Sequence, residues 1–404
     1  KILLDGATNW LKEYGIDISE LYDDSILTPK EQEKMQQQLD EYTLEDIFHH
    51  FEKKFVEIKK VYNVNSDARG IKASENIDDV IDSLRESPDL GYPMNSLLMN
   101  TVFRGARRKK YYIRSLPSGF GKSRLSLADL LRVSVPEYYS VEEGKWIKND
   151  FREKVLFIST ELEFDEIQVP SISYIAEVEE DKIVNSTCSD EEWERVEKAK
   201  EIFKKTEFWL EYLPDFTIED VESLIERHVI ENGITYCVFD YIHNSVSLMA
   251  SIANNTKSNL REDQILLLFS SKLKELANKH DIFMLTGTQL NDSWKEDGGR
   301  DNSSVRGSRG IIDKADCGIL GLPPTNKELE QTESLWKKGF KKNKKPNLVL
   351  HVFKNRGNRY KDVKIFLHTN LGTLRTVDCF VTDKNNIPIK IEAKEILNDT
   401  LEVE

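Results

Sequence analysis

The chain has 404 residues, enough for two domains whose apolar cores fold without disulfide or metal staples. Its formal net charge of −14 argues against a surface that is basic throughout, although a ring around a nucleic-acid strand needs only a few basic loops per subunit. Cys188, Cys237, Cys317 and Cys379 form no CxxC pair, and no apolar run is long enough for a membrane span or a signal peptide. We therefore expect a cytoplasmic protein without a zinc site, disulfides or membrane attachment.

The first ninety residues differ from the rest. Residues 29–62 carry apolar side chains at helical spacing, with Thr28 as the expected N-cap and Pro29 at the first helical position. We expect a helical N-terminal region over 1–62 that serves as a collar or in assembly, and a linker over 63–90. Within the linker a helix is predicted after Ser74, with an apolar stripe that packs on its own domain or docks on a neighbouring subunit.

From residue 110 onward, short apolar runs alternate with amphipathic segments. Strands are predicted at 111–114, 154–159, 235–240, 282–286, 317–322, 347–353 and 364–367, and helices at 191–205, 218–232 and 263–279. This alternation predicts an α/β domain over 91–385, a mostly parallel sheet with helices on both faces, followed by an acidic tail over 386–404. Ligands of such sheets bind at the carboxyl ends of the strands, so the residues after each run are the candidates.

Residues 116–123, Leu-Pro-Ser-Gly-Phe-Gly-Lys-Ser, follow the first predicted strand and open a helix. Successive backbone N–H groups at a helix N-terminus can surround a phosphate where small residues allow close approach. Lys122 would reach the β- and γ-phosphates, and the Ser123 hydroxyl would hold Mg²⁺. The strict pattern requires glycine at the position of Leu116, and an incidental turn is the alternative interpretation.

Polar side chains follow three of the later runs. Glu161, after the strand at 154–159, could orient and deprotonate a water that attacks a γ-phosphate. Asp240 ends a buried run and could hold Mg²⁺ through water, and Gln289 could sense the γ-phosphate and signal to the loop that follows. Each residue has an ordinary alternative as a turn or cap residue at a strand end.

Two basic segments lie near the end of the predicted domain. The loop at 291–310 is rich in Gly, Asp, Ser and Arg, which suits either a surface excursion or a grip on a nucleic-acid backbone. Lys354 and Arg356 follow a late strand and could project onto a neighbouring subunit's nucleotide, where an arginine stabilises transition-state charge. A solvated basic turn is the alternative. The lysine-rich run at 337–345 is interpreted as a solvated tip.

In this order, the motifs resemble the motor domain of DnaB-type replicative DNA helicases, which has a RecA-like fold. The resemblance rests on residues 117–123, 159–162, 239–242, 289–290 with 305–312, and 354–356, and it covers roughly residues 74–380. The N-terminal region does not clearly match the family's helical collar, as in shortened or divergent phage or plasmid versions.

The resemblance implies ATP and Mg²⁺ as cofactors. Lys122 matches the Walker A lysine, Ser123 and Asp240 the Mg²⁺-binding positions, Glu161 the catalytic glutamate, and Gln289 the γ-phosphate-coupled glutamine. The residues expected to bind the nucleotide are Ser118, Gly119, Phe120, Gly121, Lys122, Ser123 and Arg124.

The resemblance also implies partners. Lys354 and Arg356 match the basic pair that reaches a neighbour's nucleotide in a homo-oligomer, expected as a hexamer, and a primase and a loader are expected at the replication fork. The residues expected to contact single-stranded DNA are Arg306, Arg309, Arg261 and Lys257. Gly307 and Arg309 stand where the family's loop usually has Glu and Gly.

The expected function is therefore that of an ATP-dependent ring helicase that moves on single-stranded DNA and unwinds duplex DNA, in the host cytoplasm if phage-encoded. Two alternatives stay open. One is a RecA-like DNA-dependent ATPase that does not unwind, such as a recombinase or remodeller. The other is a subunit that binds nucleotide only to assemble.

Overall fold

The computed structural model describes residues 28–40, 72–86, 89–243, 245–256, 260–295, 304–305, 308–338, 344–357 and 359–398. The chain divides into two compact units, 1–77 and 78–404. In the first unit, helix α3 (Pro29–Asp40) begins where the sequence predicts, and the Thr28 hydroxyl donates to Glu31 Oε2 over 2.6 Å. The remainder of the predicted helical region, 41–62, lies outside the described residues.

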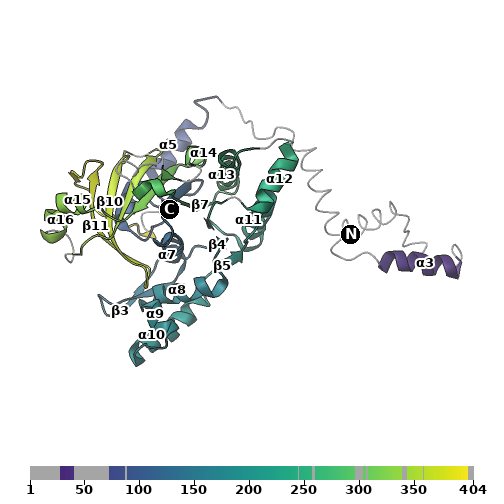
Figure 1. Cartoon of the computed structure of the whole chain (residues 1–404), viewed down its shortest axis with the longest axis horizontal. Coiled ribbons are helices and arrows are strands. Elements are labelled where there is room, and N and C mark those ends of the chain that lie inside the picture. The colour runs from purple at the N-terminus through teal and green to yellow at the C-terminus, as the bar shows by residue number, and fades with distance from the viewer. Residues whose placement is uncertain are drawn as a thin grey trace. The chain divides into compact units, whose positions relative to one another are not determined.

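The second unit is built on a ten-stranded sheet with the order β12-β11-β10-β9-β8-β1-β7-β6-β4-β5 (Figure 1). Its strands are β1 (Tyr111–Leu116), β4 (Val155–Ser159), β5 (Phe208–Tyr212), β6 (Tyr236–Asp240), β7 (Phe283–Gln289), β8 (Cys317–Leu322), β9 (Leu348–Asn355), β10 (Val363–Asn370), β11 (Arg375–Asp383) and β12 (Pro388–Ile389). β1 and β4 to β8 pair in parallel, whereas β9 to β12 form an antiparallel continuation. The predicted mostly parallel α/β sheet is confirmed.

Helices cover both faces of the sheet, as Figure 1 shows. Alternate residues of each central strand enter separate cores: Tyr112 and Phe157 lie in one, Tyr111 and Leu156 in the other. The first core includes residues of α6 (Leu97–Phe103), α7 (Lys122–Ser134), α8 (Phe164–Ala176) and α10 (Asp190–Phe203). The second includes residues of α11 (Ile218–Asn232), α12 (Val246–Thr256), α13 (Glu262–Lys279) and α14 (Ser308–Lys314). Burial on both faces explains why the central strands are continuous apolar runs.

The long surface helices begin at capping residues that the sequence makes visible. Ser189 accepts a hydrogen bond from the Glu192 backbone N–H at the start of α10, and Thr217 accepts one from Asp220 N at the start of α11. In both cases the side chain three residues on bonds back to the cap, which completes a capping box. The predicted helices 191–205, 218–232 and 263–279 therefore agree with α10, α11 and α13 to within two residues.

Several parts of the second unit, among them β5 and β11, were not predicted. A hairpin of β2 (Glu137–Ser140) and β3 (Lys145–Lys148) forms its own small sheet, and Lys198 of α10 lies 4.1 Å from the centroid of the Trp146 ring. The region expected as an acidic tail is also part of the fold up to residue 398, because β12 pairs with β11 and Ile391 and Ile396 are buried. Short helices α9 (Glu180–Val184), α15 (Asn326–Gln331) and α16 (Glu333–Lys338) and the 3-10 helix η1 (Asp292–Lys295) complete the unit.

Helix α5 (Ile77–Glu86) carries the apolar stripe that the sequence predicts. The side chains of Ile77, Val80, Ile81 and Leu84 are 44 to 51% exposed. They are therefore not packed into the core of the second unit.

No described helix is both long enough and apolar enough to cross a membrane.

Candidate nucleotide-binding site

The phosphate loop joins the buried strand β1 to helix α7. Leu116 is the last residue of β1 and is fully buried, so the position that departs from the strict glycine pattern belongs to the sheet. Gly119 and Gly121 have φ of 79° and 82°, values that favour glycine. A Cβ at Gly121 would lie 2.4 Å from a terminal methyl group of Leu371, so a larger residue would also require that side chain to move. No side chain caps α7, which leaves its first N–H groups directed at the loop.

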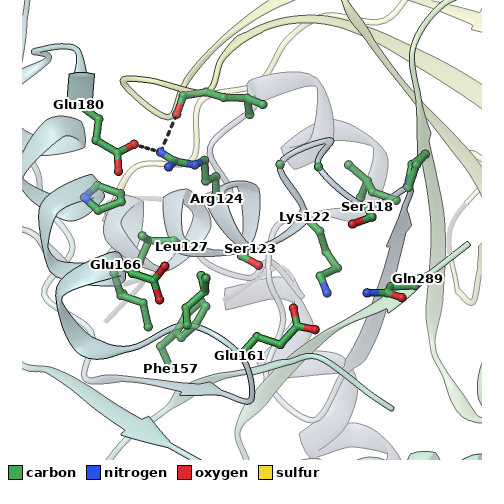
Figure 2. A pocket seen from close by; sticks show the side chains of 18 residues that line it. Ser118, Lys122, Ser123, Arg124, Leu127, Phe157, Glu161, Glu166, Glu180 and Gln289 are labelled. Atoms are coloured by element: carbon green, nitrogen blue, oxygen red, sulfur yellow. Dashed lines mark hydrogen bonds and ion pairs between the residues drawn. The ribbon is translucent and has the colours of Figure 1, made fainter. Parts of the chain in front are cut away.

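A cavity of about 310 Å³ opens beside this loop, within the size range of small-molecule sites. Most of the predicted nucleotide-binding residues line it: Ser118, Gly119, Gly121, Lys122, Ser123 and Arg124, together with Glu161 and Gln289. Figure 2 shows Lys122, Glu161 and Gln289 grouped on one side of the cavity, and Arg124, Glu166 and Glu180 on the other. Phe120 does not line it, because its ring packs on Trp294 with centroids 5.8 Å apart.

Parallel pairing explains why distant residues meet here. Leu116 of β1 lies opposite Gln289 of β7, and Ser159 of β4 lies opposite Asp240 of β6. The carboxyl ends of these strands share one edge of the sheet, as the strand-end argument predicts. Glu161 follows β4 by two residues and reaches the same edge.

A buried ion pair lies at the floor of the site. Lys122 Nζ is 3.7 Å from Asp240 Oδ1, and their side chains are 10% and 3% exposed. Burial lowers the pKa of Lys122, and Asp240 and Glu161 act in the opposite direction. Burial likewise raises the pKa of Asp240 above its ordinary value, opposed by Lys122 and by a hydrogen bond from Ser123. Each of the two charges thus partly offsets the effect of burial on the pKa of the other.

The donor set at this floor fits a divalent cation. Asp240 Oδ1 is buried and has no hydrogen-bond partner among the described residues. The Ser123 hydroxyl is close enough to hydrogen-bond to the same carboxylate. A buried carboxylate oxygen without a hydrogen-bond partner, next to a hydroxyl, offers the oxygen ligands that Mg²⁺ prefers.

Tyr241 joins the candidate base to the candidate sensor, a role that the sequence did not reveal. Its hydroxyl donates to Glu161 Oε1 over 2.8 Å and accepts from Gln289 Nε2 over 3.0 Å. Lys122 Nζ lies 3.2 Å from the centroid of its ring. The one available signal was its position directly after Asp240.

Arg124 lines the cavity but is already engaged. Its Nη1 donates to Glu180 Oε2 and, over 3.1 Å, to the backbone carbonyl of Leu371. The Glu180 backbone N–H in turn donates to Gly372 O over 3.1 Å. Arg124 therefore connects α7 to the start of α9 and to the turn between β10 and β11.

The predicted trans-acting cations lie apart from this cavity. Lys354 Nζ donates to the carbonyls of Ile312 and Asp313, and Arg356 Nη2 donates to Asp313 O over 2.9 Å. Neither residue is among those that line the cavity of its own chain. Among the described residues of the same chain, the cations that line the cavity are Lys122 and Arg124.

The predicted DNA-binding residues are only partly described. Arg261 precedes α13, and its side chain is 76% exposed and paired with Asp263. Arg309 belongs to α14, but its side chain lies outside the described part of the chain, as do Lys257 and Arg306. The loop at 291–310 is described at its base, where Leu290 pairs with Val305.

A parallel sheet with a phosphate loop after β1 and acids after two neighbouring strands defines a P-loop nucleotide-binding domain of the RecA-like class. The family described as "DnaB-like helicase C terminal domain" matches residues 94–375. The chain therefore belongs to the DnaB-like helicase family.

Related proteins agree with this assignment. The chain is 44% identical over 386 residues to the SPbeta prophage-derived uncharacterized protein YorI of Bacillus subtilis (strain 168), covering 95% of this chain and 76% of that protein. That relative is prophage-derived, which supports the expected phage version.

Two solved structures share the fold at 14% sequence identity. One, described as an ATPase domain, superposes with a TM-score of 0.59, and the match covers 77% of this chain and 99% of that domain. A DnaB-like replicative helicase, described with its interactions with primase, gives a TM-score of 0.59, and the match covers 87% of this chain and 80% of that helicase.

Proposed function

We propose that this protein is an ATP-dependent replicative DNA helicase, a ring-forming motor that moves on single-stranded DNA and unwinds duplex DNA. The observation that carries the proposal is that Lys122, Glu161 and Gln289 line one cavity beside a phosphate loop, with the buried Asp240 carboxylate 3.7 Å from Lys122 Nζ. Family membership supports the class of reaction.

The residues of the cavity have distinct proposed tasks. The backbone N–H groups of 118–124 and the Lys122 ammonium bind the phosphates of ATP. Ser123 and Asp240 hold Mg²⁺, which neutralises charge on the β- and γ-phosphates when bound. Glu161 orients the attacking water and accepts its proton, and Gln289 contacts the γ-phosphate.

The catalytic cations come from a second copy of the chain. Lys354 and Arg356 lie outside the cavity of their own subunit, as expected of groups that complete a neighbour's site. The exposed apolar stripe of α5 supports contact with another subunit as well, since such stripes are ordinarily covered. A homo-oligomer, proposed as a hexamer, satisfies both observations.

The other regions of the chain have proposed roles in the same helicase. Residues 1–62 act in assembly, 63–90 form a linker with a docking helix, and 91–385 form the motor, with which the segment up to residue 398 packs. Arg306, Arg309, Arg261 and Lys257 contact single-stranded DNA at a replication fork, where a primase and a loader are the proposed partners. The setting is the cytoplasm of the host cell.

The test is ATP hydrolysis with and without single-stranded DNA. We expect Mg²⁺-dependent turnover that single-stranded DNA accelerates, and loss of both rates in Lys122→Ala. Lys154→Ala is the matched control, because this lysine is 42% exposed and pairs with Glu207 outside the cavity. Turnover that does not respond to DNA would contradict the proposed function, and nucleotide-dependent assembly without turnover would support a subunit that binds nucleotide only to assemble.

A further inference from the structure

Tyr241 joins two residues that line the cavity, Glu161 and Gln289. It follows the last residue of β6, and its side chain is 9% exposed. Its hydroxyl is the shared atom of two hydrogen bonds, one donated to Glu161 Oε1 at 2.8 Å and one accepted from Gln289 Nε2 at 3.0 Å. The three side chains thus form a continuous chain from the end of β7 to the segment after β4.

The backbone fixes Tyr241 between these two strands. Its N–H donates to Thr160 Oγ1 over 3.2 Å, which ties it to the segment that carries Glu161. The next residue, Ile242, donates its N–H to Gly287 O over 3.0 Å, which ties it to the strand that carries Gln289. These two bonds fix the backbone. The ring itself is only 9% exposed and has Lys122 Nζ 3.2 Å from its centroid, which limits the movement of the hydroxyl.

Glu161 and Gln289 are less constrained than the tyrosine between them. Glu161 is exposed, and Gln289 is half-buried at the very end of β7. An exposed glutamate has several side-chain rotamers, and a hydrogen bond from a fixed hydroxyl selects among them. A hydroxyl that accepts an N–H also donates more strongly, because hydrogen bonds in a chain polarise one another.

Gln289 is connected directly to the loop at 291–310. The next residue, Leu290, pairs with Val305, and Asn291 N donates to Ser304 O over 2.9 Å. These contacts form the base of the loop. Displacement of this base moves the end of β7 and with it the Gln289 amide.

We propose that Tyr241 is a positioning residue whose hydroxyl relays the state of the loop at 291–310 to the Glu161 carboxylate. The inference rests on the proposed function, in which that loop contacts DNA and Glu161 activates water. Contact with DNA sets the position of Gln289, Gln289 sets the hydrogen bonding of the Tyr241 hydroxyl, and the hydroxyl sets the orientation of Glu161. Hydrolysis is thereby coupled to the presence of a strand.

Tyr241→Phe tests this relay because it removes one oxygen and keeps the ring beside Lys122. The readouts are the ATPase rate with and without single-stranded DNA and the Kd of a fluorescent ATP analogue. We expect the stimulation by DNA to fall at least about tenfold, the usual weight of a hydrogen bond to a charged group. The Kd should change by less than about twofold, because the Tyr241 hydroxyl is not among the groups proposed to bind the phosphates of ATP.

Tyr236→Phe is the matched control. Tyr236 is the first residue of β6, the strand that Tyr241 follows; it is buried, and its hydroxyl donates to Ala106 O over 2.9 Å, away from the cavity. This variant loses the same atom and should keep the stimulation of the wild type. An equal loss in both variants would show that a weakened fold explains the effect, and would overturn the relay.

Gln289→Ala breaks the chain at its other end, and the double variant tests whether the two side chains act in one chain. The relay predicts the same loss of stimulation in each single variant and no further loss in the double variant. Wild-type stimulation in Tyr241→Phe, or losses that multiply in the double variant, overturns the relay alone. A wild-type protein that DNA does not stimulate overturns the proposed function and the relay together.

Discussion

A site shared between subunits makes a quantitative prediction about mixed oligomers. Lys122→Ala removes one of the two cations that line the cavity, and Arg356→Ala removes a cation that lies outside it. Arg356→Ala alone should lose ATPase activity, because an arginine in this role is worth roughly 10³ to 10⁵ in rate. Lys122→Ala alone should also lose it, because it removes the ammonium proposed to bind the phosphates of ATP. The two defects nevertheless affect different halves of the same interface.

The expected recovery follows from the arrangement. A working interface in the mixture needs its cavity from an Arg356→Ala subunit and its arginine from a Lys122→Ala subunit. With equal amounts and random assembly, about one quarter of head-to-tail interfaces meet both conditions. Sites that act independently would then give about a quarter of the wild-type ATPase rate.

The assay mixes the two variants before assembly and measures phosphate release in the presence of single-stranded DNA. Arg359→Ala is the matched control, because Arg359 lies in the same turn but stacks on Tyr360 with its guanidinium carbon 4.7 Å from the ring centroid. That variant should keep its activity. A mixture no more active than the mean of its two parents would refute the shared site.

Three further outcomes follow from described contacts. Arg114→Met should lower the free energy of unfolding by about 3 to 5 kcal/mol in urea titrations, because it leaves Asp129 buried without its ion-pair partner. Arg114→Met/Asp129→Leu should recover most of the lost stability. Burial raises the pKa of Asp378, so the folded state binds this proton more tightly than the unfolded state does. The free energy of unfolding should therefore fall as the pH rises from the ordinary aspartate pKa through the raised one. Urea titrations across the acidic range measure this dependence, and Asp378→Asn should remove it. Glu180→Gln should tighten binding of a fluorescent nucleotide about threefold, because it releases Arg124 and removes a negative charge from the cavity; weaker binding would mean that Glu180 orients Arg124 instead.

The sequence predicted the strands that are buried on both faces, because such strands are continuous apolar runs. It did not predict β5 at the edge of the sheet, whose residues are all half-buried, or the hairpin of β2 and β3. β11 and β12 were also missed, and with them the packing of the segment up to residue 398. β5 pairs with β4 across a long sequence separation, whereas β3, β11 and β12 each pair with the strand that precedes them in the chain. Most residues of these missed strands are not fully buried, so the strands lack the continuous apolar runs of the central strands.

The site could be predicted only as far as strand ends indicate it. Glu161, Asp240 and Gln289 each follow or end a recognisable strand, so their meeting at one edge follows from the topology of a parallel sheet. The hydroxyl of Tyr241 and the pairing of Arg124 with Glu180 depend on side-chain geometry across long sequence separations. No spacing rule in the sequence encodes these contacts.

The central claim is that ATP hydrolysis at this site separates DNA strands, and strand displacement on a forked duplex tests it most directly. Glu161→Gln is the appropriate comparison, because it keeps the residues proposed to bind nucleotide and removes the proposed base. We expect the wild type to separate the strands only with ATP and Mg²⁺, and Glu161→Gln to leave the fork intact. A wild-type protein that hydrolyses ATP on single-stranded DNA but leaves the fork paired would contradict the account.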